Sequence, residues 1–262
     1  MLTRRDFLQV TAATAALMGG APFSKLAAQQ KISQEKLLEF SPVGQVTLLN
    51  FTDCHAQLMP LYFREPSVNL GVGAAHGLPP HITGANFLKH FDLKGGTPEA
   101  YAFSSVDHVA LSNSYGRIGG MAQMATLIKA IRAERSANTL LIDCGDTWQG
   151  SYSSLQTRGE DMVEVMNAMG VDLMTAHWEF TYGAERVKEL IEKLKFPFLA
   201  GNVTDTEWEE PVFKDVIFFE RGGVKIGVIG QAFPYTPIAN PRYMIPTWSF
   251  GIQEEKMRAS VK

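Results

Sequence analysis

Four short apolar segments alternate with segments of helical periodicity between residues 46 and 202, and this alternation constrains the fold more than any other feature. The apolar segments have the length and composition of buried strands and cover residues 46–51, 138–142, 171–174 and 196–199. Strands that alternate with helices form a mostly parallel sheet covered by helices. The sequence therefore predicts an α/β fold whose chemistry lies at the carboxyl edge of the sheet.

Side chains that can bind metal follow each of these expected strands. Asp53 and His55 follow the first, Asp146 the second, His177 the third and Asn202 the fourth. Each motif alone has an ordinary explanation, because Asp53-x-His55 can be a surface turn, Asp146 a helix cap and Asn202 a turn residue. Together, oxygen and nitrogen ligands at one edge indicate a pair of hard or borderline cations, with Mn²⁺ favoured and Zn²⁺ possible. Such a pair activates water, which predicts a hydrolase.

Composition narrows the class of protein. With 45% hydrophobic and 19% charged residues, the chain is expected to be a soluble globular protein. A formal net charge of −3 gives no electrostatic footprint for nucleic acid or for an anionic membrane. The two cysteines, Cys54 and Cys144, are too few for a disulfide framework. They are expected to be buried free thiols, with a disulfide or a reactive thiol as alternatives.

The amino terminus resembles an export signal. Thr3-Arg4-Arg5-Asp6-Phe7-Leu8 fits the twin-arginine pattern, and an apolar run from 10 to 18 precedes small residues at Ala27-Ala28. The run is too short to span a membrane, and an amphipathic anchor is the alternative interpretation. We therefore expect a signal peptide at 1–30, a periplasmic location, no membrane association after cleavage, and a mature domain at 31–262.

Residues from about 59 to 114 interrupt the alternation. They are rich in Gly, Pro, Asn and His, which predicts a partly helical insertion that shapes the cleft. His76, His81, His90 and His108 lie within it, and their irregular spacing favours ordinary loop histidines over another metal site. After residue 202, two apolar segments at 212–220 and 224–230 predict a hairpin, followed by a helix that begins near residue 252.

The segment Met174–Gly183, Met-Thr-Ala-His-Trp-Glu-Phe-Thr-Tyr-Gly, resembles a signature of the calcineurin-like metallophosphoesterases of the 5′-nucleotidase family. That family carries Gly-Asn-His-Glu-Phe-Asp-Tyr-Gly, in which Asn binds metal and the His-Asp pair assists catalysis. His177 stands in the Asn position, Trp178 in the His position and Thr181 in the Asp position, whereas Glu179 matches. The resemblance implies a four-layer α/β/β/α sandwich, of which this chain holds only the first half.

The departures from that signature resemble the SoxB family of periplasmic thiosulfohydrolases, as do the segments 51–58 and 231–235. The resemblance implies two Mn²⁺ ions, Trp178 and Glu179 as catalytic residues, and the carrier SoxYZ as partner. The implied reaction releases sulfate from a cysteine-bound S-thiosulfonate. A sulfur leaving group needs less protonation than an alkoxide, which agrees with the loss of the His-Asp pair. Trp178 can wall the cleft, or it can be an ordinary core residue.

Two alternative functions remain at the level of the sequence. One is a periplasmic 5′-nucleotidase or cyclic phosphodiesterase, which the substitutions at Trp178 and Thr181 disfavour. The other is a non-catalytic metal-binding module, which intact Asp53, His55 and Asp146 disfavour. The family supplies further histidine ligands and a carboxyl-terminal substrate domain at positions that would follow Lys262. The resemblance therefore implies an amino-terminal part of a longer protein that is inactive alone.

Overall fold

The structure, a computed structural model, describes residues 44–62, 71–97, 100, 103–106, 108–135 and 138–261. The chain divides into a smaller compact unit that contains residues 59–127 and a larger one that contains residues 40–58 and 128–262. The boundary between the two units falls within helix α7 (Met121–Arg135). The expected signal peptide at 1–30 lies outside the described residues.

The larger unit is built on a parallel sheet, as expected for the α/β fold. Its strands are β1 (Thr47–Phe51), β4 (Thr139–Asp143) and β5 (Leu173–Met174), in the order β1-β4-β5. Phe51 pairs with Asp143, which pairs in turn with Met174, so the strands end level with one another. The fourth apolar segment extends this order through a single parallel bridge between Met174 and Phe198. The residues that follow the strands therefore begin at one edge.

Burial explains why these segments are strands. Leu140 and Leu141 of the central strand β4 are 0% and 1% exposed, because β4 has neighbours on both sides and is covered on both faces. In β1, at the edge, half-buried and exposed residues alternate with the period of two that a strand requires. Leu140, Leu173 and Leu199 form the apolar cluster that joins the sheet to the hairpin described next.

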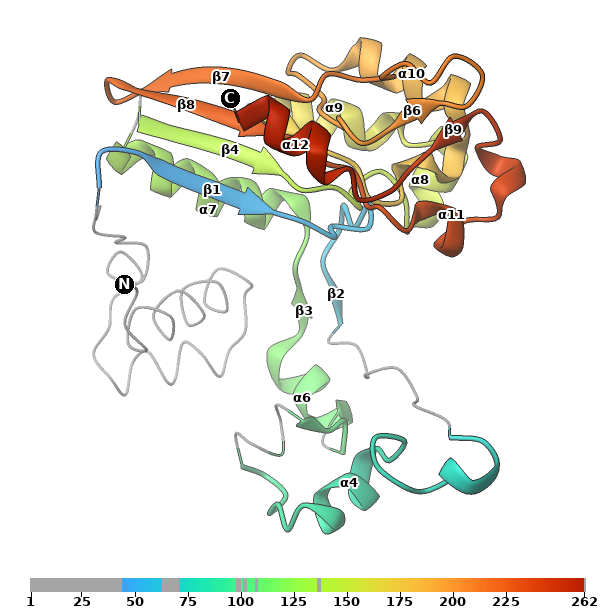
Figure 1. The fold of residues 1–262 in the computed structure, drawn as a ribbon. Coiled ribbons are helices and arrows are strands. Elements are labelled where there is room, and N and C mark those ends of the chain that lie inside the picture. Colours follow the sequence, from blue (N-terminus) through green and yellow to red (C-terminus); the bar gives the residue numbers. More distant parts are fainter. Residues whose placement is uncertain are drawn as a thin grey trace. The chain divides into compact units, whose positions relative to one another are not determined.

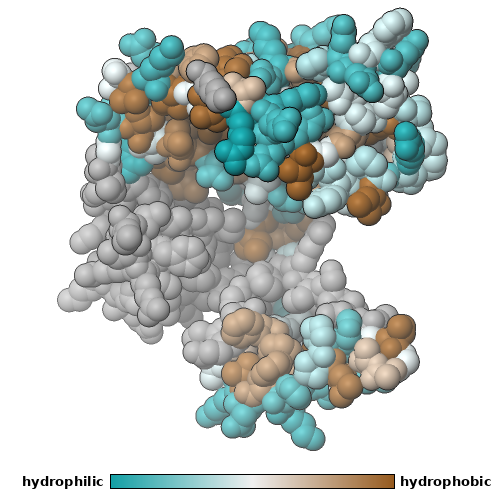
Figure 2. Space-filling view, viewed as in Figure 1, coloured by the Kyte–Doolittle hydropathy of each residue, from teal (hydrophilic) through white to brown (hydrophobic). Residues whose placement is uncertain are grey.

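The predicted hairpin is confirmed as β7 (Val216–Arg221) and β8 (Val224–Ile229), which pair antiparallel. Gly222 and Gly223 form the turn with φ of 56° and 73°, the left-handed values that favour glycine. Ile217, Phe219 and Val228 pack against the sheet cluster. Apolar side chains also gather on the surface where β7 and β8 lie (Figure 2), and Phe218 is 58% exposed.

Helices and short strands complete the larger unit (Figure 1). They are α8 (Tyr152–Thr157), α9 (Glu160–Met169), α10 (Ala184–Lys193), α11 (Thr236–Ala239), α12 (Glu254–Val261), the 3₁₀ helices η3 (Glu179–Tyr182) and η4 (Arg242–Met244), and the antiparallel pair β6 (Thr204–Asp205) and β9 (Trp248–Ser249). Helices α9 and α10 lie where the sequence predicted helical segments between the strands, and α12 begins within two residues of the predicted start near residue 252. Helix α8 was not predicted. In α9, Met162, Val163 and Met166 recur at helical spacing and are buried.

A carboxylate before β5 fixes the sheet against its neighbours. Asp172 accepts hydrogen bonds from Arg132 of α7 at 3.1 Å and from Arg221 of β7 at 2.9 Å. It also accepts one from the backbone N–H of Leu141 at 2.8 Å. Because hydrogen bonds to charged groups are stronger than neutral ones, this one side chain ties β4 and the start of β5 to both covering elements.

The smaller unit contains the segment predicted as an insertion. Its elements are β2 (Leu61–Tyr62), η1 (Gly73–Ala75), α4 (Gly84–His90), α6 (His108–Tyr115) and β3 (Arg117–Ile118), and β2 pairs with β3. Within the described residues, no group of three or more possible metal ligands forms among its histidines. No helix in the described ranges is long and apolar enough to cross a membrane.

Candidate metal centre

Backbone hydrogen bonds continue past the ends of β1 and β4 and join the first two site loops. Asp53 N–H donates to the carbonyl of Gly145 at 2.9 Å, and His55 N–H donates to that of Asp146 at 2.9 Å. Ala56 N–H donates to the carbonyl of Thr147 at 3.0 Å. The loop after β1 therefore runs beside the loop after β4, which brings Asp53 and His55 next to Asp146.

Three of the predicted ligands have left-handed backbones. The φ angles of Asp53, His55 and Asp146 are 55°, 47° and 58°, values that cost free energy for residues other than glycine. The chain therefore turns sharply after β1 instead of continuing as an extended strand. Strained backbone of this kind persists where the surrounding structure fixes it, often at functional sites.

Glycines allow the loops to approach closely. A Cβ on Gly145 would lie 2.6 Å from the backbone nitrogen of His177, and Gly145 has a φ of 97°. A Cβ on Gly150 would lie 2.7 Å from the Cβ of His55. Both distances are shorter than real contacts, so any larger residue would push a ligand out of place.

The ligand side chains meet around Asp146, whose side chain is 4% exposed. Its Oδ2 lies 2.9 Å from Nδ1 of His177 and 3.4 Å from Nε2 of His55, while its Oδ1 accepts from Nε2 of Gln149 at 2.5 Å. Asp53 lies with its Oδ1 3.9 Å from Nε2 of His55. Asp53, Asp146 and His177 each offer a ligand atom, and these atoms lie within 4.8 Å of one another. This mixture of carboxylate and imidazole ligands fits divalent cations of the hard or borderline type.

Asn202 is buried and held by backbone groups. Its Nδ2 donates to the carbonyls of Ala232 at 2.8 Å and Gly251 at 3.0 Å, and its Oδ1 accepts from the N–H of Ala232 at 2.8 Å. The side chain therefore ties the segment after residue 199 to two later loops. Its function as a metal ligand stays a prediction.

Glu179 lies beneath the metal-binding loops with no exposed surface. Its carboxylate accepts backbone hydrogen bonds from Thr147 at 2.6 Å, His177 at 2.7 Å and Asp146 at 3.1 Å, and a longer one from Trp148 at 3.3 Å. A carboxylate can accept this many because its two oxygens offer several lone pairs. The geometry is that of a positioning residue, and a part for Glu179 in the chemistry itself stays a prediction.

Two side chains that the sequence reasoning left without a function lie against the ligands. Gln149 orients Asp146, and the ring of Phe233 packs edge-on against the ring of His177 with centroids 4.3 Å apart. Phe233 belongs to the segment 231–235, whose only signal in the sequence is its resemblance to the SoxB family. Trp178 follows His177 directly, and its buried Nε1 has no hydrogen-bond partner among the described residues. Thr181 Oγ1 donates to the carbonyl of Trp178 at 2.7 Å, a local turn contact.

Buried acidic groups lie behind the ligands. Asp143 is fully buried, and its Oδ1 accepts from the N–H of Gly145 and the hydroxyl of Thr147, whereas its Oδ2 has no partner within the described chain. Burial, and then the charge of Glu179, raise the pKa of Asp143 to about 7. Burial, and then the charge of Asp143, raise the pKa of the Cys54 thiol to about 12. Cys54 and Cys144 are both free, as expected, but both are half-buried rather than buried. Cys54 stays protonated near neutral pH.

Comparisons with known proteins agree with this geometry. No family model matches the chain. The chain is 30% identical over 145 residues to the 5′-nucleotidase of Rattus norvegicus, a match that covers 53% of this chain and 25% of that protein. The structure is similar to the sulfate thiohydrolase SoxB of Thermus thermophilus, with a TM-score of 0.68, 37% identity, and coverage of 85% of this chain and 42% of that one.

A further solved structure shares the fold. The calcineurin-like phosphoesterase of Bacillus subtilis matches with a TM-score of 0.52 and 21% identity, over 82% of this chain and 58% of that one. The chain spans about a quarter of the length of the curated 5′-nucleotidases that it matches.

We predict that Glu179→Gln loosens both metal-binding loops. The amide places an NH₂ group against backbone N–H donors, so stability falls by about 3 kcal/mol and divalent-metal affinity falls with it. Urea unfolding and manganese titration measure the two effects. Glu185→Gln, at an exposed position in the first turn of α10, is the matched control. Wild-type stability and metal affinity in the Glu179 variant would contradict the positioning function.

We also predict a stability that depends on the ionisation of Asp143. Its pKa is about 7 in the folded protein against 3.8 for an unperturbed aspartate, so between these values the folded state binds more protons. The stability of the metal-free protein therefore falls as pH rises from about 4 to about 7. Asp143→Asn removes this component, so the variant gains stability relative to wild type as pH rises. Urea unfolding at several pH values measures this, and parallel pH profiles for the two proteins would disprove it.

Proposed function

The chain belongs to the hydrolase superfamily of 5′-nucleotidases and calcineurin-like phosphoesterases, and from this premise we propose that it is a thiosulfohydrolase of the SoxB type. In the proposed reaction, water attacks the terminal sulfonate of an S-thiosulfonate carried on a cysteine. Sulfate leaves, and the sulfur stays on the carrier. The carrier that we propose is SoxYZ, and the proposed compartment is the periplasm.

The observation that carries the proposal is the similarity to SoxB combined with the substitutions at Trp178 and Thr181. Among the solved structures, SoxB of Thermus thermophilus matches 85% of the chain with a TM-score of 0.68 and 37% identity, whereas the 5′-nucleotidase precursor of Thermus thermophilus matches 82% with a TM-score of 0.55 and 23% identity. The metal-binding positions Asp53, His55 and Asp146 are intact, while Trp178 and Thr181 replace the acid/base pair of the nucleotidases. A site with ligands but without that pair fits a reaction with a good leaving group.

The side chains of this site would hold and surround divalent cations, for which we propose Mn²⁺. Bound cations would supply an activated water and would neutralise charge that develops on the sulfonate oxygens. Asp146 lies between the imidazoles of His55 and His177, and Gln149 fixes the orientation of its carboxylate. Glu179 fixes the backbone on which Asp146 and His177 are carried. These contacts hold the ligands in one geometry before substrate binds, which lowers the cost of reorganisation.

The chemistry of the leaving group explains how the site works without a general acid. A phosphate monoester leaves as an alkoxide, which requires protonation, whereas a persulfide or thiolate leaves readily near neutral pH. The indole of Trp178 does not titrate and cannot deliver that proton. The hydroxyl of Thr181 donates to the carbonyl of Trp178, so it does not hold an imidazole as an aspartate would.

A 5′-nucleotidase or phosphodiesterase is the second candidate, favoured by the similarity to the rat 5′-nucleotidase. It shares the metal chemistry and differs in the leaving group. The two candidates therefore separate on the product released.

We predict sulfate release without phosphate release. The full-length protein is loaded with Mn²⁺ and given either a peptide with a cysteine S-thiosulfonate or a nucleoside monophosphate. Sulfate and phosphate are measured by ion chromatography. His177→Ala is expected to lower both metal content and sulfate release, because it removes a ligand that contacts Asp146. Phosphate release at ordinary enzymatic rates, with no sulfate, would return the protein to the nucleotidases.

We further predict that Trp178→His combined with Thr181→Asp introduces phosphomonoesterase activity. The pair restores a general acid and its carboxylate, which are worth about 10²–10⁴-fold in rate where geometry is optimal, so a gain of about tenfold or more is expected. The rate of phosphate release from a nucleoside monophosphate is the measurement, and each single variant is a control. A double variant no faster than either single one would refute the explanation of these substitutions.

A further inference from the structure

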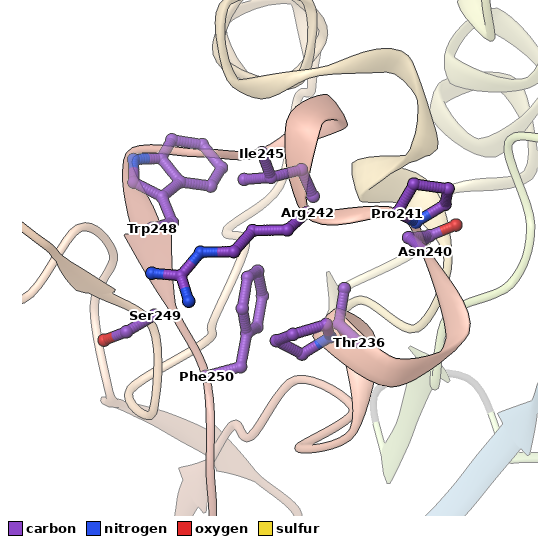
Figure 3. A pocket seen from close by; sticks show the side chains of 9 residues that line it. Thr236, Asn240, Pro241, Arg242, Ile245, Trp248, Ser249 and Phe250 are labelled. Atoms are coloured by element: carbon purple, nitrogen blue, oxygen red, sulfur yellow. The ribbon is translucent and has the colours of Figure 1, made fainter.

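A pocket of about 190 Å³ lies between α11, η4 and the segment of β9, within the larger unit (Figure 3). Its walls include the apolar side chains of Ile245, Trp248 and Phe250, and its polar lining residues are Thr236, Asn240, Arg242 and Ser249. None of the candidate metal ligands lines it. The pocket is therefore distinct from the candidate metal centre.

Arg242 supplies an unpaired charge to this pocket. Its side chain extends across the pocket between Trp248 and Phe250 and ends beside Ser249 (Figure 3). The guanidinium forms no ion pair, hydrogen bond or ring contact with the part of the chain that the structure describes. Guanidinium groups pair with carboxylates through two parallel hydrogen bonds, so the group that fits here is an anion.

Asn240 supplies a buried donor. The residue is 5% exposed, and its Oδ1 accepts from the hydroxyl of Thr181 at 3.3 Å, whereas its Nδ2 has no partner among the described residues. A buried amide without a hydrogen bond is costly, and most such groups in folded proteins have a partner. An acceptor atom on a ligand in the adjoining pocket would satisfy it.

The remaining walls select an apolar body of small size. Trp248 and Ile245 are 4% and 5% exposed, and the ring of Phe250 faces the stem of Arg242 (Figure 3). Pockets for drug-sized ligands hold about 300–1,000 Å³. The smaller volume here, 190 Å³, admits a single ring or a branched chain with one charged group.

We propose that this pocket is a binding site for a small organic carboxylate with an aromatic or branched apolar body. The carboxylate pairs with Arg242, and the body packs against Trp248 and Phe250. An oxygen of the ligand accepts from Asn240.

The pocket backs onto the loop that carries His177. Phe180 of that loop contacts Phe250 with ring centroids 4.9 Å apart and Trp248 with centroids 6.0 Å apart. Thr181 of the same loop contacts Asn240. Because a carboxylate also binds divalent metal directly, the binding test requires the protein without metal.

The test uses 4-fluorobenzoate as the probe and fluorine NMR as the readout, with metal-free protein in excess EDTA. Binding is followed by line broadening across a titration. The neutral analogue 4-fluorobenzamide tests the need for charge. Arg242→Gln removes the anion partner, and Arg258→Gln, at an exposed arginine of α12 paired with Glu254, is the matched control. Thermal unfolding and manganese binding confirm that both variants keep the fold and the metal centre.

We expect wild type and Arg258→Gln to bind the benzoate equally. Arg242→Gln is expected to bind it at least about tenfold more weakly, because a charge-assisted hydrogen bond is lost. The benzamide is expected to bind wild type at least about tenfold more weakly than the benzoate. No binding to wild type, equal binding to Arg242→Gln, or equal binding of the two probes would each overturn the proposal.

Discussion

The candidate metal centre depends on one buried carboxylate that is not expected to touch metal. Glu179 accepts backbone hydrogen bonds from the loop after β4 and from the loop after β5, and it does so with no exposed surface. An ionised carboxylate is costly to bury unless its oxygens are hydrogen-bonded, and here the N–H groups of Asp146, Thr147 and His177 supply those bonds. The same bonds fix the backbone positions of the candidate ligands Asp146 and His177. The hydrogen bonds that allow Glu179 to be buried therefore also order the site.

The parallel sheet provides the frame on which this carboxylate acts. Level strand ends bring the loops to one edge, and hydrogen bonds beyond Phe51 and Asp143 join the first two loops. Left-handed backbones at Asp53, His55 and Asp146 then turn the side chains together, with glycine at 145 and 150 where no Cβ fits. The strain of these turns is offset by the surrounding hydrogen bonds, which is why a site of this kind needs a rigid scaffold.

The segment from His177 to Tyr182 makes contacts on two sides. On one side, His177 contacts Asp146 and the ring of Phe233. On the other side, Phe180 and Thr181 contact residues that line the pocket around Arg242. Because tightly packed interiors compress little, the aromatic cluster around Phe180 supports this segment from behind.

The order of the elements and the candidate ligands could be predicted from the sequence. Period-two and helical patterns predicted the strands, the later helices and the hairpin, because burial on one face leaves a periodic record in the chain. The position of polar residues after successive strands predicted that Asp53, Asp146 and His177 would meet, since parallel strands end at one edge. Close matches to a known signature identified Glu179 and the altered positions Trp178 and Thr181.

How these residues are held follows from contacts between distant segments. The left-handed backbones at Asp53 and His55 arise from hydrogen bonds to a loop about 90 residues away in sequence, which no local pattern records. Distant segments also supply the four backbone N–H groups that donate to Glu179 and the contact of Phe233 with His177. The raised pKa of Asp143 likewise results from burial among distant segments. The pocket around Arg242 has no sequence signature, because its lining residues are brought together by a loop, a short helix and a strand whose geometry depends on packing rather than on periodicity.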